Sequence, residues 1–63
     1  MKRRHIHQLR RIGHLLRTLA KDEDVHGDLD AAELLLYLSH QVHDVADVAE
    51  DQRTACDART APR

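Results

Sequence analysis

The sequence has no Phe or Trp, a single Tyr, a single Cys, one Pro and two Gly among its 63 residues. One Cys cannot form an intrachain disulfide, which excludes a disulfide-stapled scaffold and fits a reducing compartment or a cross-link between two copies. A chain of this length buries only about 60% of its unfolded surface. Its large apolar residues are fifteen Leu, Ile and Val with Met1 and Tyr37. The core of one chain is therefore thin, and we expect a second copy or another partner to complete it.

Charge of one sign is missing from each half of the chain. Residues 3–21 contain no acidic side chain, and residues 22–52 contain ten acids and neither Lys nor Arg. The net charge of −1 excludes a globally basic nucleic-acid-binding protein, so such a role has to come from a local patch. No secretory signal is visible, and the longest apolar run, LLLYL at 34–38, is too short to span a bilayer. We therefore expect a cytoplasmic protein.

Two long segments with helical periodicity flank a polar stretch around Gly27. Apolar side chains recur at spacings of three and four, as one face of an α-helix requires. They are Ile6, Leu9, Ile12, Leu16 and Leu19 in the first segment and Ala31, Leu35, Leu38, Val42, Val45 and Ala49 in the second. The pattern predicts an all-α, antiparallel helix–turn–helix hairpin over 1–53, with helices at about 3–21 and 29–53 and a turn at 22–28. Asp28 or Asp30 can cap the second helix, and 54–63 is predicted to be a frayed tail.

The LLLYL run is apolar around the whole circumference of a helix, so one hairpin cannot cover it. A homodimer that forms a four-helix bundle explains the run, and closed homodimers are the commonest oligomers. The residues predicted to form the core or the dimer contact are Leu29, Leu35, Leu36, Leu38, Val42 and Val45. The alternative is an apolar patch that binds a different protein.

The cations of the first helix form a stripe, which we call the basic stripe. At about 100° per residue it lies opposite the Ile/Leu face and is predicted to point to solvent. Its members are Arg3, His7, Arg10, His14, Arg17 and Lys21. Arg4 and Arg11 lie on a flank, where they could pair with Asp44 or Asp51 of the second helix. Cations at a helix N-terminus oppose the macrodipole, so a ligand-binding face and a merely solvated face both stay open.

Six histidines raise the question of a metal site. Two pairs at i,i+4 spacing could each offer two ligands: His40 with Asp44, and His43 with Asp47. His7 and His14 are predicted to lie on the back of the other helix, away from these pairs. Structural zinc sites need four converging ligands, so no metal or other cofactor is expected. Catalysis is not expected either, because the chain has no Gly-rich phosphate loop and no candidate nucleophile beside a base except Ser39.

Three short strings of the second half occur in the same order in the Rop family of plasmid copy-control proteins: LDAAE at 29–33, HDVAD at 43–47 and CDAR at 56–59. The chain resembles that family there, with different spacing between the strings. The resemblance implies a dimeric four-helix bundle that binds paired RNA hairpins through its first helices. The family's RNA-contacting residues lie in its first helix, where the two sequences do not match, so none of them is transferred.

A second similarity is to the small helical-hairpin phosphatases that act on aspartyl-phosphate response regulators. Their SxxxD motif would begin at Ser39, but the fifth position is His43 and the carboxylate is displaced to Asp44. That displacement turns the carboxylate by about 100° around the helix, which argues against phosphatase activity.

Together these features predict a small, non-catalytic regulatory binding protein that forms a homodimer and binds structured RNA through the basic stripe. The alternative function is an adaptor or inhibitor that binds another protein through its basic or apolar helix faces. A basic amphipathic helix could also lie on an anionic membrane surface, which ranks third.

Overall fold

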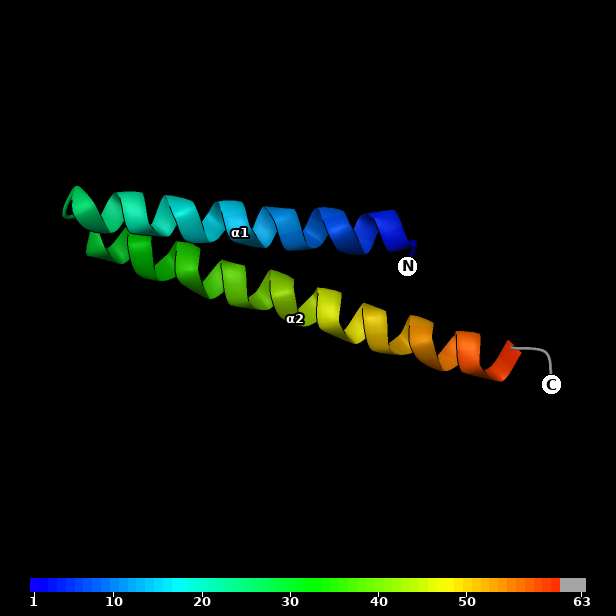
Figure 1. The fold of residues 1–63 in the computed structure, drawn as a ribbon. Coiled ribbons are helices and arrows are strands. Elements are labelled where there is room, and N and C mark those ends of the chain that lie inside the picture. The colour runs from blue at the N-terminus through cyan, green and yellow to red at the C-terminus, as the bar shows by residue number, and fades with distance from the viewer. Residues whose placement is uncertain (61–63) are drawn as a thin grey trace.

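The computed structural model describes the backbone of residues 1–60 and the side chains of residues 1–55. Over this part of the chain the fold is all-helical, with α1 at Arg3–Val25 and α2 at Leu29–Thr60. The two helices run antiparallel and lie side by side along the length of α1 (Figure 1). The all-α hairpin predicted from the sequence is confirmed.

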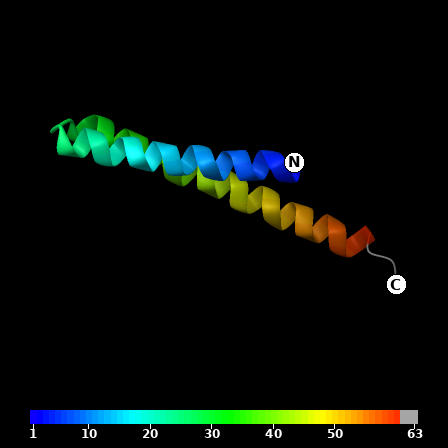
Figure 2. The same ribbon diagram turned by 45° about the horizontal axis from the view of Figure 1, so that its top comes forward.

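Both helices are longer than the sequence predicts. α1 continues through 22–25, and α2 continues to Thr60, within the segment 54–63 that the sequence predicts to be a frayed tail. Residues 61–63 of that predicted tail lie outside the described part of the chain. The end of α2 projects past the start of α1 in both ribbon views (Figures 1 and 2). The reason is that 22–25 and 54–60 contain neither Gly nor Pro, and polar residues alone do not end a helix. As far as they are described, neither helix combines the length and the hydropathy needed to cross a membrane.

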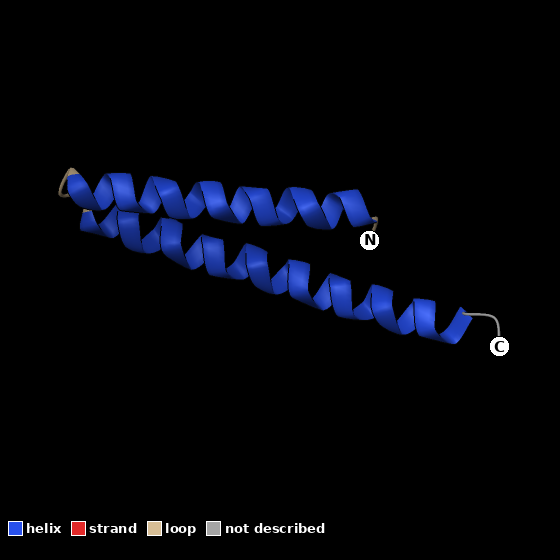
Figure 3. Cartoon of the chain, in the orientation of Figure 1, coloured by secondary structure: helices blue, strands red, loops and turns tan. Residues whose placement is uncertain are grey.

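Gly27 ends α1 in a Schellman motif. Its φ is +86°, a conformation that glycine adopts without strain. The Gly27 N–H donates to the Asp24 carbonyl at 3.1 Å, and the Asp28 N–H donates to the Glu23 carbonyl at 2.9 Å. Asp28 then caps α2, because its Oδ1 accepts a hydrogen bond from the Ala31 N–H at 3.1 Å. Of the two caps that the sequence allows, Asp28 is the one used, in the tan loop of Figure 3.

The contact between the two helices is formed mostly by small side chains. The buried residues are Ile6, Gly13 and Ala20 in α1, and Ser39, Ala46 and Ala49 in α2. The α1 set repeats every seven residues, which is the periodicity of a coiled-coil contact. A hydrophobic cluster forms where Leu9 packs against Ile6, Ala46 and Ala49. Residues this small let the helices approach closely, but they bury little apolar surface.

Seven of the exposed large aliphatic residues share one side of the hairpin. They are Ile12, Leu15 and Leu19 of α1, and Leu34, Leu38, Val45 and Val48 of α2. Viewed from each N-terminus, both sets lie about a quarter turn anticlockwise of the residues that face the other helix, and an antiparallel pair places such flanks on the same side. We call this surface the apolar face. The prediction that Ile12 and Leu19 pack between the helices of one hairpin is wrong.

Candidate nucleic-acid interface

The basic stripe lies along the boundary between the two helices. Because Gly13 and Ala20 face α2, α1 is turned about its axis relative to the predicted orientation. Arg17 and Lys21 consequently line a cleft of about 430 Å³ together with Leu29, Glu33 and Leu36 of α2. We call this side of the hairpin, opposite the apolar face, the polar flank. The prediction that the whole stripe points away from α2 is therefore wrong.

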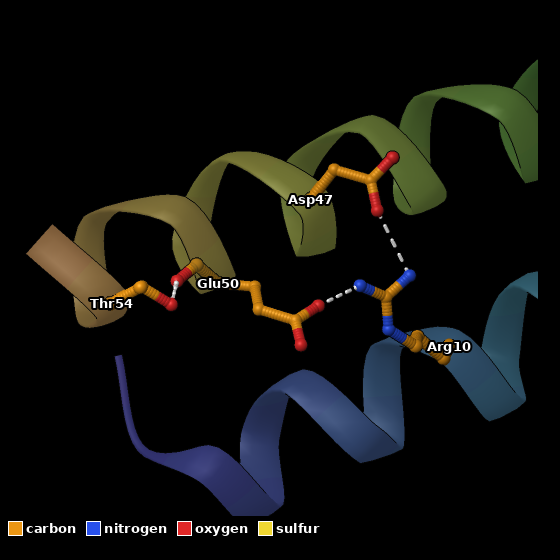
Figure 4. Close-up of polar contacts among 4 residues, drawn as sticks. All are labelled: Arg10, Asp47, Glu50 and Thr54. Carbon is orange, nitrogen blue, oxygen red and sulfur yellow. Dashed lines mark hydrogen bonds and ion pairs between the residues drawn. The ribbon is translucent and has the colours of Figure 1, made fainter.

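Arg10 is held by two carboxylates of α2. One guanidinium nitrogen donates to Asp47 Oδ1 at 3.0 Å and the other donates to Glu50 Oε2, as Figure 4 shows. The hydrogen bonds to Glu50 and then to Asp47 raise the pKa of Arg10 above its ordinary value. Since these ion pairs are exposed to solvent, they set how the helices align more than they stabilise the hairpin. A phosphate would have to compete with both carboxylates for this side chain.

The ion pairs between the described side chains of the two helices are made by Arg10, and not by Arg4 and Arg11 as the sequence predicts. Arg4 and Arg11 are exposed on the back of α1. Among the described side chains, neither pairs with Asp44 or Asp51. The cause is the same turn of α1 about its axis, which brings Arg10 to α2 and carries the flank arginines away from it.

His14 and His43 meet across the helix boundary. Their ring centroids are 5.6 Å apart and the rings are nearly perpendicular, at 82°. The sequence predicts that His14 lies on the back of α1, out of reach of the α2 histidines. That prediction is wrong, because α1 is turned about its axis relative to the predicted orientation. Within the described residues, the structure brings together no group of three or more His, Cys, Asp or Glu that could hold a metal ion.

Gly13 makes room for His43. A Cβ at position 13 would lie 2.7 Å from His43 Nε2, closer than van der Waals contact allows. The Ser39 hydroxyl donates to the Gly13 carbonyl at 2.8 Å, and Ser39 is only 3% exposed. The Ser39 hydroxyl thus joins the two helices and is not open to a substrate.

Substituting Gly13 by Ala tests the contact with His43. In a helix interior this change ordinarily stabilises by about 1 kcal/mol, but here the new methyl group meets the imidazole ring. We expect Gly13→Ala to give no gain in the free energy of unfolding, measured with urea. In a His43→Ala background the same change should gain about 1 kcal/mol. Equal gains in both backgrounds would show that the ring does not pack on Gly13.

The apolar residues assigned from the sequence to the core or the dimer divide between the two sides of the hairpin. One group is half-buried between the helices or lies on the apolar face: Leu35, Val42, Leu38 and Val45. The other group lines the cleft beside Arg17 and Lys21 on the polar flank: Leu29 and Leu36. A partner packed on the apolar face would leave this second group uncovered.

Sequence reasoning misses Arg53 on the polar flank. This residue lines a second cleft with Arg3, His7 and Arg10. It lies where the apolar pattern of α2 fades, so it gives no signal in hydrophobic periodicity. Its position seven residues after Ala46 is the signal that could have found it, because a heptad repeat returns to the same face of the helix.

No family model, curated protein or solved structure matches this sequence. The residues of the hairpin offer an exposed apolar face on one side and, on the other, a flank that carries both cations and carboxylates.

Proposed function

We propose that the chain is a small, non-catalytic regulatory binding protein that works as a homodimer. Two hairpins pack their apolar faces together into a four-helix bundle. The observation that carries this proposal is how side chains are sorted by size: apart from Ile6, the fully buried residues are small, and most of the large aliphatic residues are exposed. Leu34 is 65% exposed and Leu15 is 59% exposed, in a chain too short to leave such residues in water and still bury a sufficient core.

A second copy is the occupant that suits the apolar face. The face runs along both helices, and monomeric proteins rarely leave a large apolar patch exposed. A two-fold pair buries the same patch on both subunits without requiring any other chain. The resemblance to the Rop family supports the same arrangement. The single Cys56 suits a reducing location such as the cytoplasm.

The proposed ligand is structured RNA, bound on the polar flank. In the dimer the apolar faces are covered, so the polar flanks stay on the outside with Arg3, His7, Arg17 and Lys21 exposed. Structured RNA is recognised largely through its shape and its phosphates, which a row of cations at helical spacing can follow. Arg10 contributes less than the sequence predicts, because Asp47 and Glu50 already bind it.

The alternative is an adaptor or inhibitor that binds another protein. The carboxylates around Arg10 favour it, because a flank that mixes Asp47 and Glu50 with cations suits a protein surface of mixed charge. The two functions differ in how binding responds to salt and to the loss of cations.

Removing Arg17 and Lys21 tests the RNA proposal. An RNA hairpin is titrated with the protein over a range of salt concentrations, and the slope of log affinity against log salt is measured. Each phosphate contact contributes about 0.7 to 0.9 to that slope, so Arg17→Gln with Lys21→Gln should make it shallower by about 1.4 to 1.8 units per hairpin.

The matched control is the double substitution Arg4→Gln with Arg11→Gln, on the back of α1, which removes equal charge. It should lower the affinity for RNA much less. If neither structured RNA nor duplex DNA binds at low salt, the adaptor function takes first place.

A further inference from the structure

A cleft of about 300 Å³ lies where α1 begins and α2 runs past it. Its walls carry three guanidinium groups from two helices, those of Arg3, Arg10 and Arg53. His7 also lines it, and within residues 1–55 the carboxylate of Glu50 is the single anionic wall group. Even with a neutral imidazole, positive charge is therefore in excess in this small space.

Arg53 is the wall residue whose hydrogen bonding is incomplete among the side chains of residues 1–55. Its Nε is buried from solvent and has no hydrogen-bond partner among these described side chains. The carboxylate of Glu50, a wall residue on the same helix, is turned toward Arg10 instead (Figure 4). A buried donor of a charged group without an acceptor is unfavourable. An acceptor supplied from outside the chain would remove that cost.

The first turn of α1 adds to the positive potential at the cleft. This turn contains no acidic residue, and the N-cap residue Lys2 makes no side-chain capping bond. The free N–H groups at a helix start carry partial positive charge and favour anions. Arg3, in the same turn, lines the cleft, so the helix end and the guanidinium groups act in the same direction.

We propose that this cleft binds a phosphate group, with Arg3 and Arg53 as its principal donors. Guanidinium groups bind phosphate through paired N–H···O bonds, and a phosphate oxygen can bond the Arg53 Nε once that side chain turns toward the cleft. The donors come from two helices, which suits a tetrahedral anion with several acceptor oxygens better than a planar carboxylate. Arg10 stays on its carboxylates and holds the two walls together.

The phosphate group has two possible sources that share this chemistry. It belongs to an RNA backbone, in which case the site rests on the proposed function, or to a small phosphorylated ligand, in which case it does not. The site adds Arg53 of α2 to a binding surface that the basic stripe confined to α1.

The test titrates the full chain, labelled with ¹⁵N, with inorganic phosphate at constant ionic strength. The expected result is a saturable shift of the Arg53 Nε–H signal and of the first-turn amides of α1. Arg53→Gln should weaken phosphate binding by about tenfold, the size of one charge-assisted hydrogen bond. Arg3→Gln should weaken it in the same way, and because Arg3 is exposed its loss leaves the hairpin folded. Arg11→Gln, on the back of α1, should leave the affinity unchanged.

Two results overturn the site. One is a set of shifts that rises linearly with phosphate concentration, as it does with chloride; the other is an unchanged affinity for phosphate in Arg3→Gln. Titrating the same variants with an RNA hairpin separates the two sources. Parallel loss of RNA and phosphate binding assigns the group to the RNA backbone. If the protein binds phosphate saturably but binds no RNA, the site is supported and its ligand is a small phosphorylated molecule. In that case only the proposed RNA function is refuted.

Discussion

Replacing Leu38 with Asp is expected to dissociate the protein and to unfold most of its helix. In a single hairpin Leu38 is 47% exposed, so a carboxylate there would be hydrated at little cost. In the proposed bundle the same carboxylate would be buried against the second hairpin, and an unpaired buried charge costs several kcal/mol. Sedimentation at micromolar concentration, with circular dichroism on the same sample, measures both effects.

Leu36→Asp is the matched control for this experiment. Leu36 lies two residues away in the same helix and is 41% exposed, but it lines the cleft on the polar flank. A monomeric hairpin would tolerate both substitutions alike, whereas the dimer should tolerate only the change at Leu36. Equal mass and equal helicity for the two variants would contradict the proposal that a second hairpin packs on the apolar face.

Replacing Ala46 with Leu is expected to cause the largest loss of stability among changes within one hairpin. Ala46 is 0% exposed and packs against Ile6 and Ala49. Adding three carbon atoms to a filled contact typically costs about 1–3 kcal/mol. In a domain of this size each kcal/mol lowers the melting temperature by about 4–8 °C, so thermal unfolding should shift by on the order of 10 °C.

Ala55→Leu provides the comparison for Ala46→Leu. Ala55 is exposed near the end of α2, where the same three carbon atoms meet no packed neighbour. Its melting temperature should stay close to that of the wild type. If Ala46→Leu melts like Ala55→Leu, the close contact of small residues between the helices is not what joins them.

The hairpin and its turn could be predicted from the sequence because their signals are local. Apolar residues at spacings of three and four predict two helices whichever way they face each other. Gly27 marks the turn because a positive φ, which ends a helix, is favourable for glycine and unfavourable for most other residues. Asp28 follows it directly, and Asp is a strong N-cap residue.

The rotation of α1 could not be predicted from hydrophobic periodicity. That pattern weighs Ile12 and Leu19 above Gly13 and Ala20, so it turns the large residues toward α2. In the structure the small residues lie between the helices, because close backbone approach and the Ser39 hydrogen bond to Gly13 favour them there. Arg10 and His14 follow this rotation onto the polar flank.

The same sorting explains why one hairpin looks incomplete. A helix pair joined through Gly13, Ala20 and Ala46 leaves its large aliphatic residues for another contact. The buried positions of α1 repeat every seven residues, at Ile6, Gly13 and Ala20, and two of these three residues are too small to register in a pattern of Leu and Ile.

The solution mass of the wild-type chain is the most direct test of the proposed bundle. Sedimentation equilibrium is run across micromolar concentrations, and helicity is measured by circular dichroism on the same samples. The bundle predicts a species of twice the mass of one chain, with mass and helicity falling together on dilution because the hairpin depends on its partner. A fully helical species with the mass of one chain at every concentration would contradict it.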